Sequence, residues 1–382
     1  MRFREFTEQW EQKTFDETFS ILSNNTLSRA ELNYENGNYK NIHYGDVLIK
    51  FSAFIDASSP EVPYINDENS SSKLDNILLQ DGDIIIADTA EDFTVGKATE
   101  IENIDKIKVV SGLHTIPCRP KIKFSPRYLG YYVNSPAYHN QLIPFIQGVK
   151  VSSISKTLIK KTFVSFPSLS EQTKIADFLS CLDKKIETQN KIISKYETLI
   201  KGLCDILFTV TEENVLPLKS IASIDKGQQI NGLSLAKTGK YYYLNGGITP
   251  SGYVDDYNTS ENTIAISEGG NSCGFVSYNA QKFWSGGHCY TLKIKNTQCR
   301  SNFLFFYLKY REKDIMQLRV GSGLPNIQKK SLENFVVPLP TFEKQCYIEC
   351  ILESITAKKE IETALLGQFQ SQKKFLLSKM FI

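Results

Sequence analysis

Side chains with catalytic or metal-binding chemistry are sparse in this chain of 382 residues. The four histidines are too few and too widely separated for a metal cluster; they are His43, His114, His139 and His288. Cys346 and Cys350 lie four positions apart, but no nearby histidine completes a zinc site, and the eight cysteines include no Cys-x-x-Cys pair. We expect reduced, structural thiols and neither a metal nor another cofactor.

Sequence motifs of common enzyme classes are also absent. The chain has no Gly-x-Gly-x-x-Gly turn after a strand, no phosphate-binding loop ending in Gly-Lys-Ser/Thr and no His-Glu-x-x-His. Its only Glu-x-Lys stretch, Glu11–Lys13, lies at the extreme N-terminus and does not indicate a nuclease centre. His114 and His288 end matching Ser-Gly-x-His stretches, where they either close a turn or contact DNA. The simplest interpretation is a protein that binds without catalysing a reaction.

Basic side chains gather in two loops that contain no acidic residue. The loops, Ile143–Lys161 and Met316–Lys330, both contain Gly and Ser. Such loops can present backbone amides and cationic heads to phosphates. A solvated loop explains either copy alone, but the recurrence favours phosphate contact. The candidate contacts are Lys150, Lys156, Lys160, Lys161, Arg319, Lys329 and Lys330.

The first of these loops leads into a long helix with a coiled-coil seam. Its apolar residues recur at alternating steps of four and three, with Gln189 as the only polar member. The seam positions are Ile175, Leu179, Leu182, Ile186, Gln189, Ile193, Tyr196, Ile200, Leu203 and Leu207. Ser168 and Glu171 form a capping-box signature, so we expect the helix to begin near residue 169. About 40 residues at roughly 1.5 Å each predict a rod on the order of 60 Å long. The alternative is a stripe that packs on its own globular domain.

The same module occurs twice. A shift of 173 residues (340 − 167) aligns Pro167 with Pro340 and Gln172 with Gln345. The second seam comprises Ile348, Leu352, Ile355, Leu366, Phe369 and Leu376. Lys359, Glu362 and Lys373 interrupt it, and we expect the apolar stripe to shift instead through Ile361, Leu365 and Phe369. Two such helices, related by a pseudo-two-fold axis, would pair antiparallel.

The repeat predicts an α+β protein in which two pseudo-symmetric globular α/β domains are separated by two long antiparallel coiled-coil helices. The expected boundaries are 1–167 and 209–340 for the domains and 168–208 and 341–382 for the helices. The 41% hydrophobic and 23% charged content is typical of a soluble globular protein. No stretch of about 18 apolar residues occurs, and the N-terminus is too polar for a secretory signal, so we expect a cytoplasmic location. The formal net charge of +2 argues against a protein coated in nucleic acid but allows local basic patches.

These features together resemble a known family. A variable domain ends in a Gly-containing basic loop, continues as Pro-Ser-Leu-Ser-Glu-Gln-x-x-Ile-x-x-Phe-Leu, and finishes with a long helix ending in Leu-Phe; the same organisation recurs in the second half. This organisation is similar to the specificity subunit of type I restriction–modification systems, most specifically over 163–208 and 335–381. The second copy departs from it, because Pro340 is followed by Thr-Phe-Glu-Lys-Gln.

The resemblance implies a DNA-binding, non-catalytic subunit with two target recognition domains. Each domain would read one half of a bipartite target on double-stranded DNA, and the two helices would act as a ruler between the half-sites. The partners implied are two adenine methyltransferase subunits and two translocating endonuclease subunits. The alternatives are a divergent stand-alone DNA-modifying enzyme and a purely structural coiled-coil scaffold.

Polar loop residues are the candidates for reading bases within such domains. Gln and Asn can pair with adenine and Lys with guanine in the major groove. Each candidate could equally be a solvated loop residue. The candidates are Lys97, Lys121 and Lys123 in the first domain, and Lys226, Gln228, Gln229 and Asn271 in the second.

Overall fold

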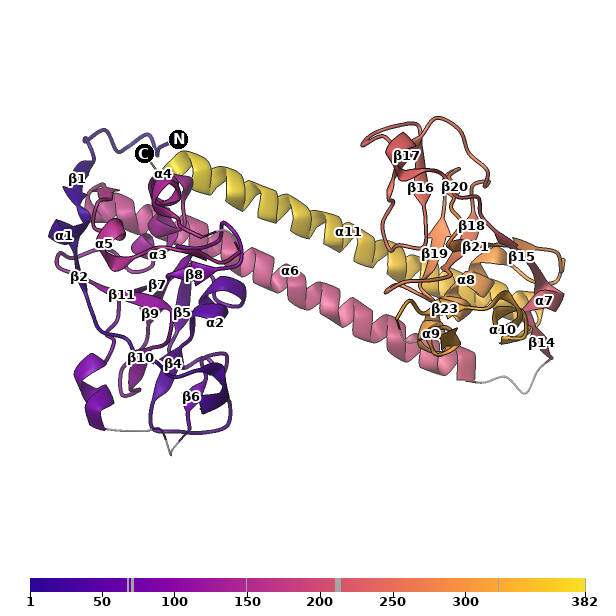
Figure 1. Ribbon diagram of the computed structural model, residues 1–382, viewed down its shortest axis with the longest axis horizontal. Helices are drawn as coiled ribbons and strands as arrows, with labels where there is room; N and C mark the ends of the chain where they lie inside the picture. Colours follow the sequence, from indigo (N-terminus) through magenta and orange to yellow (C-terminus); the bar gives the residue numbers. More distant parts are fainter. Residues whose placement is uncertain (67–68, 70–71, 149, 210–213, 322, 382) are drawn as a thin grey trace. The chain divides into compact units, whose positions relative to one another are not determined.

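The computed structural model describes residues 1–66, 69, 72–148, 150–209, 214–321 and 323–381 (Figure 1). The chain forms two compact units. Unit 1 comprises Met1–Thr188 with Leu365–Ile382, and unit 2 comprises Gln189–Ala364. Two long helices, α6 (Leu169–Thr209) and α11 (Phe342–Met380), each contribute to both units. None of the described helices combines the length and apolar character needed to cross a bilayer.

Unit 1 is built on two sheets. The five-stranded sheet has the order β2-β11-β7-β9-β5, with bounds Phe19–Ile21, Thr115–Pro120, Ile84–Ala87, Ala98–Glu102 and Phe54–Asp56. The four-stranded sheet has the order β10-β4-β6-β3, with bounds Val109–Ser111, Lys40–Ile42, Tyr64–Ile65 and Leu32–Asn33. Two further pairs are β1 (Glu11–Thr14) with β13 (Phe163–Phe166), and β8 (Thr89–Ala90) with β12 (Ser152–Ser153). The short helices are α1 (Phe15–Thr18), α2 (Tyr44–Ile49), α3 (Tyr128–Val133), α4 (Pro136–Leu142) and α5 (Lys156–Ile159).

Unit 2 repeats this plan with fewer strands. One sheet has the order β15-β21-β18-β19, with bounds Ala222–Lys226, Cys289–Ile294, Thr263–Ser267 and Val276–Asn279. The other has the order β17-β16-β20, with bounds Gly252–Val254, Tyr241–Leu244 and Trp284–Ser285. The pairs are β14 (Val215–Pro217) with β24 (Val336–Pro338), and β22 (Arg319–Val320) with β23 (Asn326–Ile327). The short helices are α7 (Leu218–Ile221), α8 (Ser301–Tyr310), α9 (Glu312–Gln317) and α10 (Lys329–Glu333).

Strand pairing shows that the repeat is topological as well as sequential. β11 lies between β2 and β7 in unit 1, and β21 lies between β15 and β18 in unit 2, with antiparallel pairing throughout. In the smaller sheets the parallel pair β4–β10 of unit 1 corresponds to the parallel pair β16–β20 of unit 2. The predicted fold class, with two repeated α/β domains and long coiled-coil helices, is therefore confirmed.

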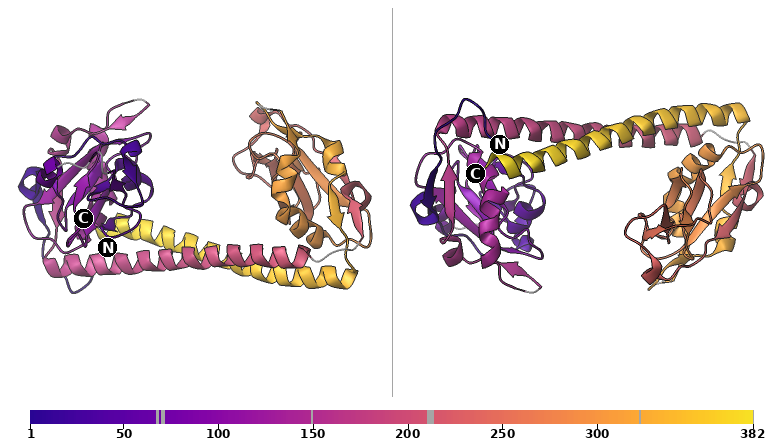
Figure 2. Two further views of the ribbon diagram at one scale, coloured as in Figure 1. Left: turned by 90° about the horizontal axis from the view of Figure 1, so that it is seen from below. Right: turned by 90° about the horizontal axis from the view of Figure 1, so that it is seen from above.

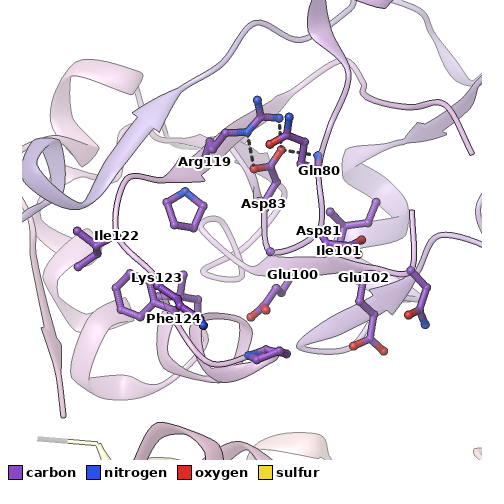
Figure 3. Close-up of a pocket in the computed structure, with 15 residues that line it drawn as sticks. Gln80, Asp81, Asp83, Glu100, Ile101, Glu102, Arg119, Ile122, Lys123 and Phe124 are labelled. Carbon is purple, nitrogen blue, oxygen red and sulfur yellow. Dashed lines mark hydrogen bonds and ion pairs between the residues drawn. The ribbon is translucent and has the colours of Figure 1, made fainter. Parts of the chain in front are cut away.

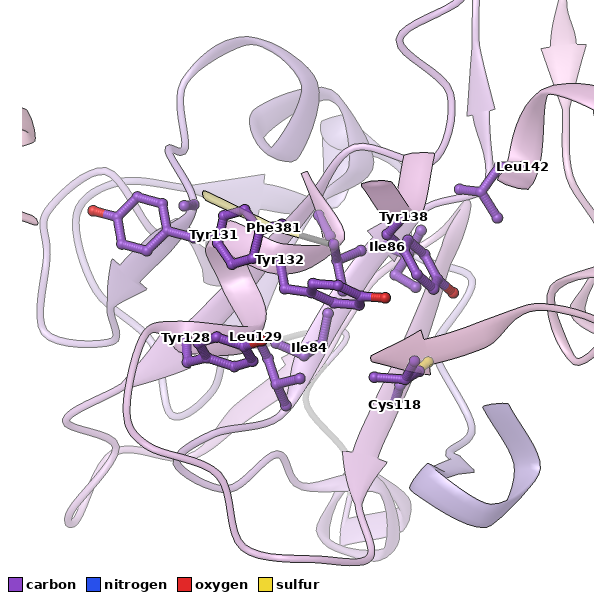
Figure 4. Packing of buried hydrophobic residues seen from close by; sticks show 14 of the residues in the cluster. Ile84, Ile86, Cys118, Tyr128, Leu129, Tyr131, Tyr132, Tyr138, Leu142 and Phe381 are labelled. Atoms are coloured by element: carbon purple, nitrogen blue, oxygen red, sulfur yellow. The ribbon is translucent and has the colours of Figure 1, made fainter. Parts of the chain in front are cut away.

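An aromatic cluster joins each domain to the long helices. In unit 1, Phe381 at the end of α11 packs on Tyr128 and Tyr132 of α3, with ring centroids 5.8 and 5.7 Å apart (Figure 4). Phe208, its counterpart in the repeat, packs on Phe303 and Tyr307 of α8 in unit 2, at 6.0 and 5.4 Å. Each contact buries large apolar surface, so each domain and its helix ends form one core.

A buried glutamine at the start of each long helix adds a polar link. Gln172 accepts a hydrogen bond from the Ser125 amide at 2.9 Å and donates to the Pro167 carbonyl at 2.9 Å. Gln345 accepts from the Arg300 amide at 2.9 Å and donates to the carbonyls of Pro340 (2.9 Å) and Gln298 (2.8 Å). The two glutamines are repeat equivalents, so both units tie the loop before α3 or α8 to the first turn of a long helix.

Polar residues lie within the seam between the two long helices. Lys373 pairs with Asp183 at 2.5 Å in unit 1, and Lys359 pairs with Glu197 at 3.7 Å in unit 2. Gln189, which is buried, donates to the Glu362 carbonyl at 3.0 Å and also to its carboxylate. The expected shift of the apolar stripe through Ile361 is wrong, because that side chain is 66% exposed. Each polar residue of the seam has a hydrogen-bond or ion-pair partner on the facing helix, which offsets the cost of burying it. Within each unit, pairs at these positions require the two helices to run antiparallel.

The apolar seam positions are buried to different degrees. The buried seam residues are Ile175, Leu179, Leu182, Ile348, Leu352 and Leu376. Ile186 and Phe369 pack on the core of unit 1, and Ile200, Leu203 and Leu207 pack on that of unit 2. Ile193, Tyr196, Ile355 and Leu366 are half-buried. Burial is therefore deepest where the helices meet a domain.

The start of α6 differs from the expected capping box. The helix begins at Leu169, but the Glu171 carboxylate is buried and receives two 2.7 Å bonds from the guanidinium of Arg2. Paired bonds from a guanidinium stabilise a buried carboxylate better than one backbone amide does. Met1 binds the Lys379 carbonyl, so the two ends of the chain lie side by side in unit 1 (Figure 2).

Candidate nucleic-acid interface

In unit 2, several strand ends converge on one polar surface, which we call surface 2. It comprises Lys226–Gln229, Asn245–Gly246, Glu268–Asn271, Gly286–His288 and the hairpin β22–β23. Glu268, directly after the central strand β18, pairs with Lys226 Nζ at 2.5 Å and with His288 Nδ1 at 3.3 Å. Tyr290 Oη donates to the same carboxylate at 3.2 Å. Glu268 therefore organises the centre of surface 2.

The equivalent strand ends of unit 1 form surface 1. It comprises Asn24–Asn25, His43–Tyr44, Asp88–Ala90, Gly112–His114 and the strand pair β8–β12 with Lys156. Asp88, directly after β7, lies 3.3 Å from His114 Nδ1. Lys156 Nζ donates to Asn24 Oδ1 at 3.1 Å, and Asn24 Nδ2 donates to the Gly112 carbonyl at 3.1 Å.

Matching backbone hydrogen bonds hold the two surfaces in the same form. The Asp88 amide donates to the His114 carbonyl at 3.1 Å, and the Glu268 amide donates to the His288 carbonyl at 2.9 Å. The Ile154 amide donates to the Asp88 carbonyl at 2.9 Å, and the Ile327 amide donates to the Glu268 carbonyl at 2.8 Å. These bonds place each Gly-containing basic loop beside a carboxylate and a histidine.

More of the predicted DNA-binding residues lie on surface 2 in unit 2 than on surface 1 in unit 1. Surface 2 includes Lys226, Gln228, Gln229, Asn271 and Arg319, all of them exposed. Lys330 is exposed on α10, and Lys329 lies 3.9 Å from Glu333. Among the loop lysines of unit 1, Lys156 belongs to surface 1, while Lys150 and Lys161 are exposed. Lys160 is paired with Asp16 at 3.1 Å.

The three base-reading candidates of unit 1 lie away from surface 1. Lys97 is half-buried and donates to the Leu48 carbonyl at 2.9 Å; burial, with Lys373 nearby, lowers its pKa. Lys121 binds the Asp16 carbonyl. These side chains are engaged by the protein itself, so the structure does not bring them together as a reading surface.

Lys123 lines a separate cavity of about 430 Å³ (Figure 3). The cavity also holds Glu100 and the Asp83–Arg119 pair, whose shortest separation is 2.7 Å. Glu100 is buried and accepts from the amides of Arg127 (2.6 Å) and Gly130 (2.9 Å); burial raises its pKa to about 7. Glu100 thus caps the start of α3, and the carboxylates of this cavity would repel a phosphate.

Sequence reasoning missed the residues that organise both surfaces. Asp88 directly follows the apolar run Asp83–Ala87, and Glu268 lies two positions after the similar run Asn262–Ile266. Asn24, His43 and Asn245 follow short strands that carry little periodicity. Extending the repeat through the ends of these strands would have identified surface 1 from surface 2.

Comparison with known proteins shows the family. The family model for the type I restriction modification DNA specificity domain matches residues 7–198 and again 212–369. A protein of Methanocaldococcus jannaschii named as a type I restriction enzyme specificity subunit is 24% identical over 98% of this chain and 93% of its own length. A protein of Mycoplasma pneumoniae named as a type I specificity subunit is 35% identical over 32% of each chain.

Solved structures show the same fold. The crystal structure of a type I restriction–modification S subunit from M. genitalium superposes with a TM-score of 0.66 at 18% identity, covering 100% of this chain and 99% of that one. A chain from a structural study of type I complex assembly and conformational transition gives a TM-score of 0.58 at 16% identity, over 98% and 97% of the two chains. Two matches to the family model, repeated units and a full-length fold match agree, and this chain belongs to the family of type I restriction–modification specificity subunits.

Proposed function

We propose that the chain is the non-catalytic DNA-reading subunit of a type I complex and that surfaces 1 and 2 each contact one half of a bipartite target. The observation that carries this proposal is the recurrence of the same strand-end surface, with a basic Gly-containing loop beside it, in both units. Loops held by a rigid scaffold are suited to reading bases, while the basic loops are suited to phosphate contact.

The boundaries 1–167 and 209–340 are proposed as the two target recognition domains, with 168–208 and 341–382 as the helices that space them. A helix of fixed length between two readers sets the number of unread base pairs, as dimer geometry sets half-site spacing elsewhere.

The outer faces of the helices are proposed to dock the catalytic partners, two adenine methyltransferase subunits and two endonuclease subunits, in the cytoplasm. Large apolar side chains stand exposed there without covering the seam; they include Phe178 (42%), Leu199 (48%), Ile206 (66%), Tyr347 (62%) and Phe375 (55%). Exposed apolar groups of this size are typical of interaction surfaces. Aspartate at Phe178 and Phe375 should prevent co-purification of the methyltransferase while leaving the helical content unchanged.

The direct test maps methylated adenines in cells that carry the chain and its methyltransferase. The proposal expects a motif with two defined halves and an undefined spacer. Alanine at Gln228, Gln229 and Asn271 should relax one half only, and relaxation of both halves would contradict independent reading. Methyl transfer or cleavage by the purified chain alone would instead support a stand-alone enzyme.

A further inference from the structure

A histidine–carboxylate pair occurs at the same place in both units. His114 and His288 each end a Ser-Gly-x-His turn before β11 or β21, and each Nδ1 lies 3.3 Å from the carboxylate that follows the central strand. His114 has φ of 55°, so this turn is held in the left-handed region that non-glycine residues seldom adopt. A turn that keeps an unfavourable backbone conformation to present an imidazole suggests that the side chain has a role.

The imidazoles face outward and the carboxylates face inward. The side chains of His114 and His288 are 46% and 63% exposed, whereas those of Asp88 and Glu268 are 25% and 11% exposed. Within the described residues, no bonded partner is found for Nε2 of either histidine. Each pair therefore points a free ring nitrogen into solvent beside a basic loop.

Two carboxylates would weaken DNA binding if they faced phosphates without compensation. A protonated imidazole removes that repulsion, and its Nε2–H becomes a donor for a phosphate oxygen. Histidine is the side chain that gains this proton between pH 5 and 8. We propose that His114 and His288 contact the DNA backbone in their protonated form, so that DNA binding by each unit takes up a proton. The inference rests on the proposed DNA-binding role of surfaces 1 and 2.

The two pairs are not equivalent in charge. Glu268 is also paired with Lys226 at 2.5 Å, so a second cation remains when His288 is neutral. Asp88 accepts a hydrogen bond from the Thr89 hydroxyl at 2.7 Å, and among the described residues only His114 is found within ion-pair distance of it. The other groups beside His114 are the edge of Tyr44, with ring centroids 5.3 Å apart, and His43, whose pKa is lowered by burial. Unit 1 should carry most of the proton uptake.

The test measures the affinity of the assembled methyltransferase complex for its target duplex between pH 6 and pH 8 at constant salt. The unchanged complex should bind on the order of tenfold more tightly at pH 6, with a steeper salt dependence. H114Q should remove most of this pH dependence and H288Q a smaller part. H139Q is the control, because His139 bonds the Val95 carbonyl at 2.9 Å away from surface 1.

A variant that gains affinity guards against loss of folding. D88N removes the repulsive charge, so it should strengthen binding at pH 8 and flatten the pH profile, and misfolding cannot produce such a gain. An affinity that does not change with pH in the unchanged complex overturns the inference. The variants K156A and K226A distinguish failure of the histidine inference from failure of the proposed DNA-binding surfaces. If they weaken binding while H114Q leaves the pH profile intact, only the histidine inference fails. If neither lysine variant alters affinity, the proposed surfaces themselves are wrong.

Discussion

Surfaces 1 and 2 share a frame but differ in the side chains that fill it. Both have a carboxylate after the central strand, a histidine turn and a neighbouring basic loop, joined by the same backbone hydrogen bonds. Near the ends of β2 and β15 the chain presents Asn24–Asn25 in one unit and Lys226–Gln229 in the other. After β4 and β16 it presents His43–Tyr44 and Asn245–Gly246. A shared frame with different tips allows two half-sites of different sequence to be read in the same geometry.

The largest expected effect comes from exchanging one globular domain together with its surface. Replacing residues from about Thr209 to Val336 with the matching region of a relative should abolish one original half of the methylated motif and leave the other half unchanged. The reason is that each unit has its own core and its own surface. Long-read mapping of methylated adenines measures the outcome, and simultaneous change of both halves would contradict the comparison.

Lengthening both helices tests whether the units are spaced by the rod. A heptad inserted after Thr188 in α6 and another after Ala364 in α11 add about 10 Å at 1.5 Å per residue. The spacer of the motif should then lengthen by about three base pairs, at roughly 3.4 Å each, while both half-sites keep their sequence.

The matched control inserts the heptad in α6 alone. The core of unit 2 takes Phe208 from α6 and Ile348 from α11, so extension of one helix is opposed by the other and should impair assembly instead of moving the spacer. Methylation with the original spacing by an assembled double-insertion variant would show that the helices are not the ruler.

The two buried glutamines should differ in what they contribute to stability. Gln345→Ala removes the partner of the buried Pro340 carbonyl and of two partly buried groups, the Arg300 amide and the Gln298 carbonyl, whereas Gln172→Ala removes the partner of one buried amide and one buried carbonyl. Each unsatisfied buried group costs about 1–3 kcal/mol, so we expect about 4 kcal/mol for Gln345 and about 3 kcal/mol for Gln172. Limited proteolysis with mass spectrometry should show each loss of stability in the unit that contains the substituted glutamine. Equal losses in both units would show that the two glutamines do not stabilise their units separately.

Glu100 should make unit 1 more sensitive to pH than unit 2. Burial raises the pKa of this carboxyl to about 7 in the folded state, so the folded state binds the proton more tightly than the unfolded state does. Its contribution to stability is therefore greatest below about pH 4.5 and is lost as pH rises through about 7, by up to about 3 kcal/mol. Pulse proteolysis between pH 5 and 8 measures this change, and peptides from unit 2 provide the internal reference.

The smallest effect separates two lysines that look alike in sequence. Lys226→Ala should weaken DNA binding by about tenfold and lower the salt slope by about one, because one phosphate contact is lost. Lys97→Ala should leave both quantities unchanged, because its half-buried side chain lies away from surface 1. Fluorescence anisotropy across salt concentrations distinguishes them, and equal effects would remove the distinction between surface and interior lysines.

Sequence periodicity alone determined the long helices and the repeat. The seam of α6 is readable because helical patterning depends on residues three and four positions apart. Its start near Leu169 is indicated by the Ser168 and Glu171 signature, and the equivalence of Gln172 with Gln345 by the constant shift of the repeat. The family resemblance rested on the same local patterns. The basic loops were also visible, because their lack of acidic residues is a property of contiguous sequence.

Tertiary structure decided which polar residues lie together. Arg2 finds Glu171 across 169 positions, and His114 finds Asp88 across 26, through strand pairing that no local pattern records. Polar residues remain in the seam because the facing helix supplies their partners; they are Lys359, Glu362 and Lys373. The sequence of one helix alone does not show which residues of the other helix lie opposite. Lys97 and Lys226 look equivalent as loop residues, yet one is half-buried and the other reaches a surface, because burial depends on how distant segments pack and not on the residues beside them in sequence.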